Sequence, residues 1–217
     1  MDANSWIKVY EILKEKIIKG IYNPGEKLNE REIAQLAYVS RTPVREALRI
    51  LENEGYVINI PKKGVFVKKY SPSELDTLHR MLMRLEGLAM EMASIILTPE
   101  DINALEEMNR EMEVLSKQEN YTDYFICNIN FHLYFPKVTG SSELFDTISQ
   151  LRKRIFRFYY AQITMYHDPG QYVKDHWEII AALKGEGDKR PEKLMEEHID
   201  RARRSFLEFY RKFSVQN

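Results

Sequence analysis

Apolar residues recur every three or four positions from residue 72 to residue 213, and this region lacks the alternating pattern of a strand. Prolines, glycines and capping residues divide it into six predicted helices, over residues 72–97, 99–115, 123–135, 142–158, 171–183 and 192–213. In the first helix the expected core stripe is Leu75, Leu78, Met81, Leu82, Leu85, Leu88, Ala89, Met92 and Ile96. Short loops join the helices, so the pattern predicts an antiparallel bundle of six or seven helices.

Residues 5–69 follow a different pattern. An amphipathic helix is predicted first, then a short helix after the capping residue Asn29, and a third helix from Ser40 to about Glu54. Two apolar runs then flank Pro61-Lys62-Lys63-Gly64, which predicts a β-hairpin with a basic tip. Three helices followed by a two-stranded wing is the order of a winged helix-turn-helix. We therefore expect two domains, over residues 1–70 and 71–217.

The third predicted helix carries the residues suited to DNA. Arg41, Arg45 and Arg49 follow at four-residue spacing and form one outward stripe, and Ser40 and Thr42 add hydroxyl groups at its N-terminal end. A helix N-terminus favours phosphate groups, and an arginine can bind guanine O6 and N7 with two hydrogen bonds. The alternative is a solvated helix face. The preceding tight turn and the basic hairpin make DNA binding the favoured interpretation.

Charge and composition agree with this division. Residues 1–70 hold 13 Lys and Arg against 9 Asp and Glu, while the other 147 residues hold 19 against 24. A basic first domain on an acidic body is typical of a protein with one polyanion-binding part. The single cysteine, Cys127, cannot form an internal disulfide, and neither a signal peptide nor an apolar run of membrane length is visible. These features predict a cytoplasmic protein without a membrane segment.

The first seventy residues resemble the GntR family of bacterial transcriptional regulators. The match is carried by Pro24–Glu30, Ile33–Ala34, Val39–Leu48, Leu51–Glu52 and Glu54–Gly55. By position, the resemblance implies DNA contacts at Arg31, Ser40, Arg41, Thr42 and Arg45, with Lys63 and Gly64 at the wing tip. Tyr38 departs from the family pattern, which usually has Gly in the turn between the two helices. A tyrosine with positive φ would be strained there, or the turn differs slightly.

Three histidines fall inside the later predicted helices. His176 and His198 each lie eleven residues from Gly187, the centre of the turn between the last two helices, so a helical hairpin brings them to one level. His132 shares a helix face with Asn128, four residues earlier. Neutral imidazoles that converge suit a divalent metal such as zinc, nickel, manganese or iron. From spacing alone, three separately satisfied core or surface histidines are the favoured interpretation.

The helical region resembles the FCD-type effector domain of the FadR-like branch of the family. The resemblance lies in Asn128-x-x-Phe131-His132, Thr139-Gly140-Ser141, His176-Trp177-x-Ile179-Ile180 and Glu197-His198-Ile199. It implies a divalent metal ion, zinc, nickel or manganese, with Asn128, His132, His176 and His198 as ligands. Asn128 stands where the family usually has Asp, which removes one negative charge from the implied site.

The same resemblance implies a small carboxylate effector that completes the coordination of the metal. An arginine on the first bundle helix often holds this effector, but Leu82 occupies that position here. Arg80 and Arg84 are the nearest arginines and are the candidate effector-binding residues, although they lie on other faces of the helix. Further candidates to line the cavity are Arg154, Tyr159 and Tyr160.

Taken together, the sequence predicts a homodimeric regulator that binds a palindromic DNA operator, by default as a repressor, and senses a metabolite. Enzymatic activity is not expected. His167-Asp168 resembles the dipeptide of the HD hydrolases, but Pro169-Gly170 follows at once and places it in a loop, and no phosphate loop or nucleophile elbow is visible. The alternative function is that of an architectural winged-helix protein that binds nucleic acid without responding to a metabolite.

Overall fold

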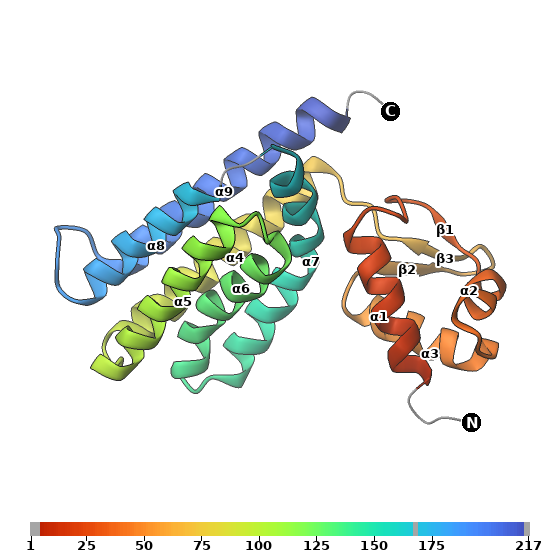
Figure 1. Ribbon diagram of the computed structural model, residues 1–217, viewed down its shortest axis with the longest axis horizontal. Helices are drawn as coiled ribbons and strands as arrows, with labels where there is room; N and C mark the ends of the chain where they lie inside the picture. The colour runs from red at the N-terminus through yellow and green to blue at the C-terminus, as the bar shows by residue number, and fades with distance from the viewer. Residues whose placement is uncertain (1–4, 167–168, 215–217) are drawn as a thin grey trace. The chain divides into compact units, whose positions relative to one another are not determined.

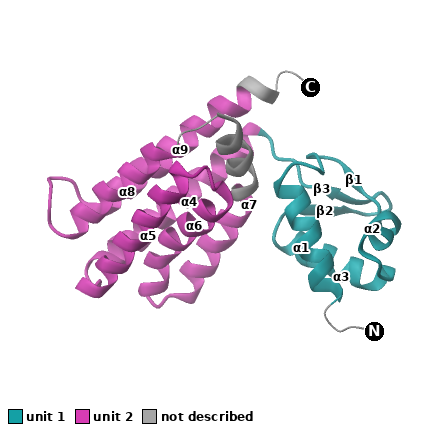
Figure 2. Cartoon of the chain, in the orientation of Figure 1, with its two compact units in different colours: residues 1–71, 156–161 teal, residues 72–155, 162–217 magenta. Residues whose placement is uncertain are grey.

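The computed structural model divides the chain into two compact units (Figure 2). The first unit comprises residues 1–71 with 156–161, and the second comprises residues 72–155 with 162–217. The structure describes residues 5–166 and 169–214, with the backbone alone over 156–166 and 212–214. The chain is mainly helical, as the sequence predicts, with a small antiparallel sheet in its N-terminal part (Figure 1).

The first unit packs three helices against a sheet. Its elements are α1 (Ser5–Ile18), β1 (Lys27–Leu28), α2 (Glu30–Ala37), α3 (Arg41–Asn53), β2 (Val57–Ile60) and β3 (Gly64–Val67). Its core contains Val9, Leu13, Ile33, Val44, Ala47, Leu48, Leu51, Val57 and Val67. Each larger aliphatic side chain buried there stabilises the fold by roughly 1.5–3 kcal/mol. Because α3 buries its apolar stripe in this core, its arginine stripe faces outward.

The sheet has three strands rather than the two that the sequence predicts. Its order is β1-β3-β2, and both pairs are antiparallel. The β2–β3 hairpin is confirmed, with Ile60 opposite Gly64 at its closed end. The added strand β1 pairs Lys27 with Phe66 and Leu28 with Val65. A two-residue strand is too short to show an alternating pattern, so only the tertiary contact with β3 reveals it.

The second unit is a bundle that contains six helices within the described residues. They are α4 (Pro72–Ser94), α5 (Pro99–Lys117), α6 (Tyr121–Val138), α7 (Ser142–Tyr166), α8 (Gly170–Leu183) and α9 (Pro191–Ser214). Helix α4 packs on α6 and α9, α5 packs on α6 and α8, and α8 packs on α9. In the described part of the chain, we find no helix with both the length and the apolar character needed to cross a membrane.

Helix α6 continues through Pro136, which the sequence analysis took as the mark of its end. The helix extends to Val138, and the N–H of Thr139 still donates to the carbonyl of Phe135 at 3.2 Å. A proline removes one backbone donor, the one that would reach the carbonyl of His132. So close to the end of a helix this removes a single hydrogen bond, and the buried ring of Pro136 adds to the core.

Helix α4 has two apolar faces instead of the single predicted stripe. Leu75, Leu82 and Ala89 are buried as expected, on the face that also buries His79 and Glu86. The other face carries Met81, Leu88 and Met92, which are 46%, 46% and 38% exposed. Apolar residues cover more than half of the helix circumference, so spacing alone could not tell which side meets the core.

Candidate metal centre and DNA-binding surface

The predicted DNA contacts lie on the outward side of α3 and beside it. Ser40 is the N-cap residue of α3, as predicted, with extended backbone, but its side chain makes no capping hydrogen bond. Arg41, Thr42 and Arg45 are exposed, while Val44 in the same turns is fully buried. The core contact of α3 therefore determines which side chains are available to a partner.

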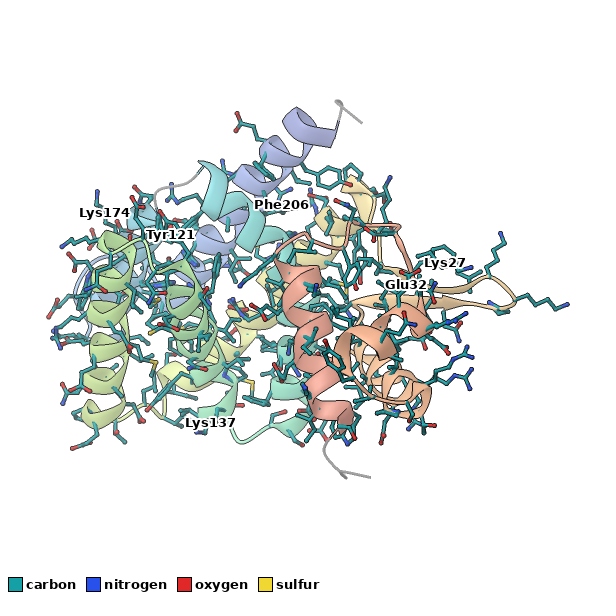
Figure 3. All side chains as sticks on the ribbon, turned by 45° about the vertical axis from the view of Figure 1, so that its right-hand side comes forward. Lys27, Glu32, Tyr121, Lys137, Lys174 and Phe206 are labelled. Carbon is teal, nitrogen blue, oxygen red and sulfur yellow. The ribbon has the colours of Figure 1, made fainter. Side chains whose placement is uncertain are left out.

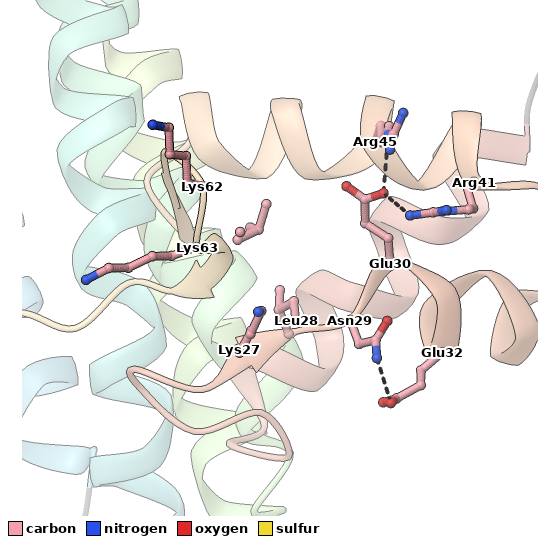
Figure 4. Close-up of a pocket in the computed structure, with 11 residues that line it drawn as sticks. Lys27, Leu28, Asn29, Glu30, Glu32, Arg41, Arg45, Lys62 and Lys63 are labelled. Carbon is pink, nitrogen blue, oxygen red and sulfur yellow. Dashed lines mark hydrogen bonds and ion pairs between the residues drawn. The ribbon is translucent and has the colours of Figure 1, made fainter.

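A concave surface of about 600 Å³ lies between the N-terminal half of α3, the start of α2, β1 and the hairpin tip (Figure 4). Its lining residues are Lys27, Leu28, Asn29, Glu30, Glu32, Arg41, Arg45, Lys62, Lys63, Gly64 and Val65. Four of the predicted DNA contacts, Arg41, Arg45, Lys63 and Gly64, are among them. Arg31, Ser40 and Thr42 are exposed residues outside this lining. All seven assignments remain predictions.

Lys27 and Lys62 are two cations of this surface that the sequence analysis did not single out. Lys27 lies on β1 and lines this surface together with Glu32 of α2 (Figures 3 and 4). It belongs to the Pro24–Glu30 run that carries the family resemblance, so its place in that motif was the available signal. Lys62 precedes Lys63 at the hairpin tip and has a positive φ of 64°.

Tyr38, the C-cap residue of α2, has the left-handed conformation that the sequence analysis raised as a source of strain. Its φ is 56° and its ψ is 44°, and its side chain is 93% exposed. A residue with a Cβ pays roughly 1–2 kcal/mol in this region of backbone space. The exposed ring gains almost no burial in return.

Three histidines converge in the second unit, from three different helices. His176 of α8 has its Nε2 atom 3.3 Å from Nε2 of His132 on α6 and 3.3 Å from Nε2 of His198 on α9. One ring nitrogen from each residue lies within 4.8 Å of those of the other two. The three residues are 2%, 0% and 5% exposed for His132, His176 and His198. The hairpin of α8 and α9 thus brings two histidines together at the level that their spacing predicts.

An oxygen acceptor holds the second ring nitrogen of each histidine. Nδ1 of His132 lies 2.8 Å from Oε2 of Glu86, and Nδ1 of His198 lies 3.2 Å from Oδ2 of Asp175. Nδ1 of His176 lies 3.2 Å from Oδ1 of Asn109, whose amide nitrogen donates to the carbonyl of Val173 at 3.1 Å. That second bond assigns the orientation of the Asn109 amide. Each Nδ1 therefore carries the proton and donates it.

These contacts leave the three Nε2 atoms facing one another. Burial lowers the pKa of His132 and of His176 well below the ordinary value, so both rings are neutral at pH 7. The Nε2 lone pairs of these two neutral rings repel each other unless a proton or a metal ion lies between them. Neutral imidazoles whose far nitrogens donate to carboxylate or amide oxygens form the ligand set preferred by divalent transition metals. The residues present therefore fit the implied metal.

The fourth predicted ligand, Asn128, is half-buried and lies one turn before His132 on α6. Sequence reasoning missed the residues behind the histidines, namely Glu86, Asn109 and Asp175. Each is a buried polar residue within a helix. The signal for Glu86 and Asn109 was a polar residue within an otherwise apolar stripe, and that for Asp175 was its place directly before His176.

The arginine in the histidine network comes from α7. Arg152 donates from Nη2 to Glu86 at 2.5 Å, and Glu86 in turn binds His132. The two predicted effector-binding arginines lie elsewhere: Arg80 pairs with Asp76 and Arg84 pairs with Glu196, and both side chains are more than 60% exposed. Of the other candidates, Arg154 is half-buried. The side chains of Tyr159 and Tyr160, and the pair His167-Asp168, lie outside the described residues.

Comparison with known protein families gives two matches that together span most of the chain. Residues 7–67 match the gntR family of bacterial regulatory proteins, and residues 77–201 match the FCD domain. The second match alone covers more than half of the 217 residues.

Related proteins that this chain covers over most of their length carry the names of regulators. The Uxu operon transcriptional regulator of Escherichia coli strain K12 is 31% identical, over 93% of this chain and 86% of its own. The HTH-type transcriptional repressor RspR of the same strain is 25% identical, over 88% of this chain and 84% of its own. The Uxu operon regulator of Haemophilus influenzae is 28% identical, over 94% of this chain and 82% of its own.

Solved structures share the fold. E. coli McbR/YncC superposes with a TM-score of 0.78 at 22% identity, covering 95% of this chain and 98% of that one. A transcriptional regulator GntR from Rhodococcus sp. RHA1 superposes with a TM-score of 0.74 at 21% identity, covering 94% and 98%. At these identities the likeness concerns the fold alone.

Proposed function

The chain belongs to the gntR family of bacterial regulatory proteins, as a DNA-binding transcriptional regulator with an FCD domain, and we propose that it represses its genes until a small carboxylate metabolite binds the helical domain. The observation that carries the metabolite site is the buried cluster of His132, His176 and His198. Its three Nε2 atoms face one another, and each ring is oriented by an oxygen behind it.

The cluster is proposed to hold a divalent metal, zinc, nickel or manganese, through these three imidazoles. A bound metal would supply the positive charge to which a carboxylate effector binds. Asn128 is the proposed fourth ligand, through its amide oxygen. With asparagine in place of aspartate, the ligand set carries no negative charge of its own. An anionic effector then neutralises more of the metal's charge, which favours carboxylates over neutral metabolites.

Arg152 is the residue best placed to respond to an anion near the histidines. It is only 11% exposed and shares Glu86 with His132. An anion that enters this network competes with Glu86 for the guanidinium group. Arg80 and Arg84 remain candidates for the effector, but both face outward in the free protein.

The operator is proposed to be a palindrome bound by a homodimer that forms through the exposed face of α4. Its apolar residues lie at alternating spacings of three and four, as in a helix that pairs with another helix: Leu78, Met81, Leu85, Leu88 and Met92. If two copies of α4 pack antiparallel about an axis beside Leu88, Arg84 of one copy lies next to Glu91 of the other. That pairing is self-complementary, as a two-fold symmetric interface requires.

Leu88→Arg tests the dimer, with Ile126→Arg as its matched control. Leu88 and Ile126 are 46% and 53% exposed, but Ile126 lies on α6 rather than on α4. Sedimentation at micromolar concentration is expected to show a dimer for the wild type and for Ile126→Arg, and a monomer for Leu88→Arg. A dimer in all three proteins would contradict this interface.

Effector control requires that the ligand bind one state of the regulator better than the other. A coupling free energy of about 1–3 kcal/mol would change operator affinity by about 5–150-fold. The test starts with selection of bound fragments from the source genome at roughly 150 mM salt, because affinities without a stated salt concentration carry no information on specificity.

The selected fragment is then titrated with metal-loaded protein and a panel of small carboxylates. An enriched palindrome that one carboxylate releases from the wild type, but not from His132→Ala, is the expected outcome. Binding to all fragments, fading steeply with salt, would support the architectural alternative instead. Release that is equal in both proteins would separate the effector from the histidine cluster.

A further inference from the structure

Glu30 is an acidic residue within the concave DNA-binding surface, where it contacts two arginines at once. Its Oε2 atom accepts a hydrogen bond from Nε of Arg45 at 2.9 Å and lies 3.5 Å from Nη2 of Arg41 (Figure 4). The side chain of Glu30 is 26% exposed, whereas those of Arg45 and Arg41 are 64% and 62% exposed. The carboxylate is thus more buried than either guanidinium group, and the two arginine side chains extend from it toward solvent.

A negative charge at this place works against binding a polyanion, because it reduces the positive potential of the surface. Lys27, Lys62 and Lys63 line the same concavity, so Glu30 stands among cations that attract phosphate. Glu30 repels DNA, so its presence here suggests that its carboxylate contributes to DNA recognition in another way.

The contribution of Glu30 to recognition is indicated by the atom of Arg45 that it binds, which is Nε. A guanidinium group has five N–H donors, and only one of them belongs to Nε. Because Glu30 binds Nε, the four donors on the two terminal nitrogens of Arg45 stay available. Those nitrogens can together bind O6 and N7 of one guanine. Arg41, by contrast, faces Glu30 with a terminal nitrogen and at a longer distance, so it is held less closely.

We propose that Glu30 is a positioning residue for DNA recognition, which orients Arg45 toward one base pair and increases sequence specificity while reducing overall affinity for DNA. An arginine side chain is flexible, and ordering it in the free protein removes part of the entropy loss on binding. The inference rests on the proposed role of Arg45 as a base contact. It adds a residue that touches no DNA in this scheme yet changes which DNA is bound.

A purely structural role for Glu30 is the competing explanation. Glu30 is the first residue of α2, where an acidic side chain interacts favourably with the helix dipole. Glu32 provides the matched control, because it lies in the same first turn of α2 and lines the same concavity. Its carboxylate binds the side-chain amide of Asn29 at 2.8 Å. Glu32→Gln therefore removes the same charge from the same place without affecting the contact between Glu30 and Arg45.

The experiment compares Glu30→Gln, Glu30→Asp and Glu32→Gln in the full-length protein. For each variant, the dissociation constant is measured for the fragment selected from the genome and for unrelated duplex DNA of equal length, at one salt concentration. Both Gln variants are expected to bind unrelated DNA more tightly, by a similar factor, because each loses one negative charge. Only the Glu30 variants are expected to lower the ratio of specific to nonspecific affinity, by about tenfold.

Glu30→Asp separates the effect of the negative charge from the effect of side-chain length. It keeps the negative charge and suits a helix N-terminus equally well, but its carboxylate is one methylene shorter and lies farther from Nε of Arg45. Unrelated DNA should bind to it as to the wild type, while the specificity ratio falls as in Glu30→Gln. An unchanged ratio in both Glu30 variants, or an equal fall in Glu32→Gln, would overturn the positioning role.

Arg45→Ala, measured in parallel, distinguishes this inference from the function on which it rests. If Arg45→Ala keeps the wild-type ratio, the base-contact assignment fails and the positioning role fails with it. If Arg45→Ala lowers the ratio while both Glu30 variants keep it, only the positioning role is overturned. Fragments with single base-pair substitutions complete the test. One such substitution should no longer lower the affinity of Arg45→Ala, because Arg45 contacts that base pair. The same substitution should lower the affinity of Glu30→Gln less than it lowers that of the wild type.

Discussion

The two candidate sites use a carboxylate in the same way but in opposite surroundings. In the DNA-binding surface, Oε2 of Glu30 lies 2.9 Å from Nε of Arg45, and the two side chains are 26% and 64% exposed. In the histidine cluster, Oε2 of Glu86 lies 2.8 Å from Nδ1 of His132, and both side chains are 2% exposed. In each site the carboxylate binds one nitrogen of a neighbouring side chain, Nε of Arg45 or Nδ1 of His132, and leaves the other nitrogens of that side chain for a ligand.

The difference in exposure implies a difference in how function relates to stability. An exposed ion pair contributes about 0–1 kcal/mol, so the DNA-binding surface can change without loss of the fold. A buried polar group that loses its partner is far more destabilising, typically by about 1–3 kcal/mol. We therefore expect function and stability to be separable in the first unit and coupled in the second.

Removal of a histidine from the cluster should have the largest effect. His176→Ala leaves a cavity, an unpaired Asn109 oxygen and an incomplete ligand set. We expect the variant to retain less divalent metal than the wild type after loading and dialysis, and the free energy of unfolding of its second unit to fall by about 2–5 kcal/mol. Metal analysis measures the first effect. The fluorescence of Trp177, isolated in a Trp6→Phe background, measures the second, because the chain has only two tryptophans.

The first unit provides the internal control for this variant. Trp6 lies on α1, so a Trp177→Phe background reports the unfolding of that unit alone. Its stability should be the same with and without His176→Ala. Full metal content together with unchanged stability in the second unit would remove the reason to treat the three histidines as one site.

Arg45→Ala should show the opposite behaviour. If Arg45 binds a base, operator affinity should fall by about 1–3 kcal/mol. Because its side chain is 64% exposed, the free energy of unfolding of the first unit should change by no more than about 0.5 kcal/mol. Fluorescence anisotropy of the selected fragment measures the affinity. Wild-type affinity in this variant would contradict the assignment.

Arg49→Ala, one turn further along α3, is the companion measurement. Its side chain is exposed and could be either a phosphate contact or part of a solvated face. A phosphate contact would weaken binding to all sequences alike and lower the salt dependence by about one ion. A solvated face would change neither.

Acid should destabilise the second unit selectively, because all five histidines follow residue 78 and none lies in the first unit up to residue 71. Burial lowers the pKa of His79, on α4, from its ordinary value of 6.5 to about 4. Below pH 6.5 the unfolded chain binds a proton here that the folded chain does not bind. Stability is therefore lost as the pH falls from about 6.5 toward 4, by about 2 kcal/mol between pH 7.5 and pH 5 for this residue.

His79→Phe isolates this contribution, because the ring of His79 stacks on Phe206 of α9 and phenylalanine preserves that packing. Unfolding is followed through Trp177 in the presence of a chelator, which keeps metal release out of the comparison. The variant should lose about 2 kcal/mol less than the wild type over this pH range. An equal loss in both proteins would show that His79 is not the group responsible.

The same contrast explains what could be predicted from the sequence. Arg41, Thr42 and Arg45 lie within five consecutive residues of one helix, so helical spacing alone places them on one face. The histidines come from three helices, and only the symmetric spacing of His176 and His198 about Gly187 indicated that two of them meet. Glu86 and Asn109 were not predicted, because their role depends on how α4 and α5 pack against α6 and α8.

Two errors in the fold have the same origin. The predicted stripe of α4 merged a buried face with an exposed one, since periodicity measures amphipathicity but not the position of the neighbouring helices. Strand β1 was missed because two residues have no measurable period, and it exists through its pairing with β3. Local signals predicted the elements themselves, and tertiary contacts decided which faces they present.

The smallest predicted effect concerns Tyr38, an exposed residue of the first unit whose backbone conformation is strained. Glycine adopts a φ of 56° without a steric penalty, so Tyr38→Gly should raise the free energy of unfolding of the first unit. Glycine also gains conformational freedom in the unfolded chain, which offsets part of the gain. The net increase should be at most about 1 kcal/mol, measured through Trp6.

Tyr38→Ala distinguishes relief of strain from loss of the ring. Alanine keeps the Cβ that clashes in the left-handed region, so this variant should gain no stability although it removes the same aromatic group. Tyr38 does not line the concave surface, so we expect neither variant to change operator affinity. If both variants bind the operator more weakly while only Tyr38→Gly is stabilised, the ring is a DNA contact whose position requires the strained turn. In that case the first unit, too, would couple function to stability, at this one residue.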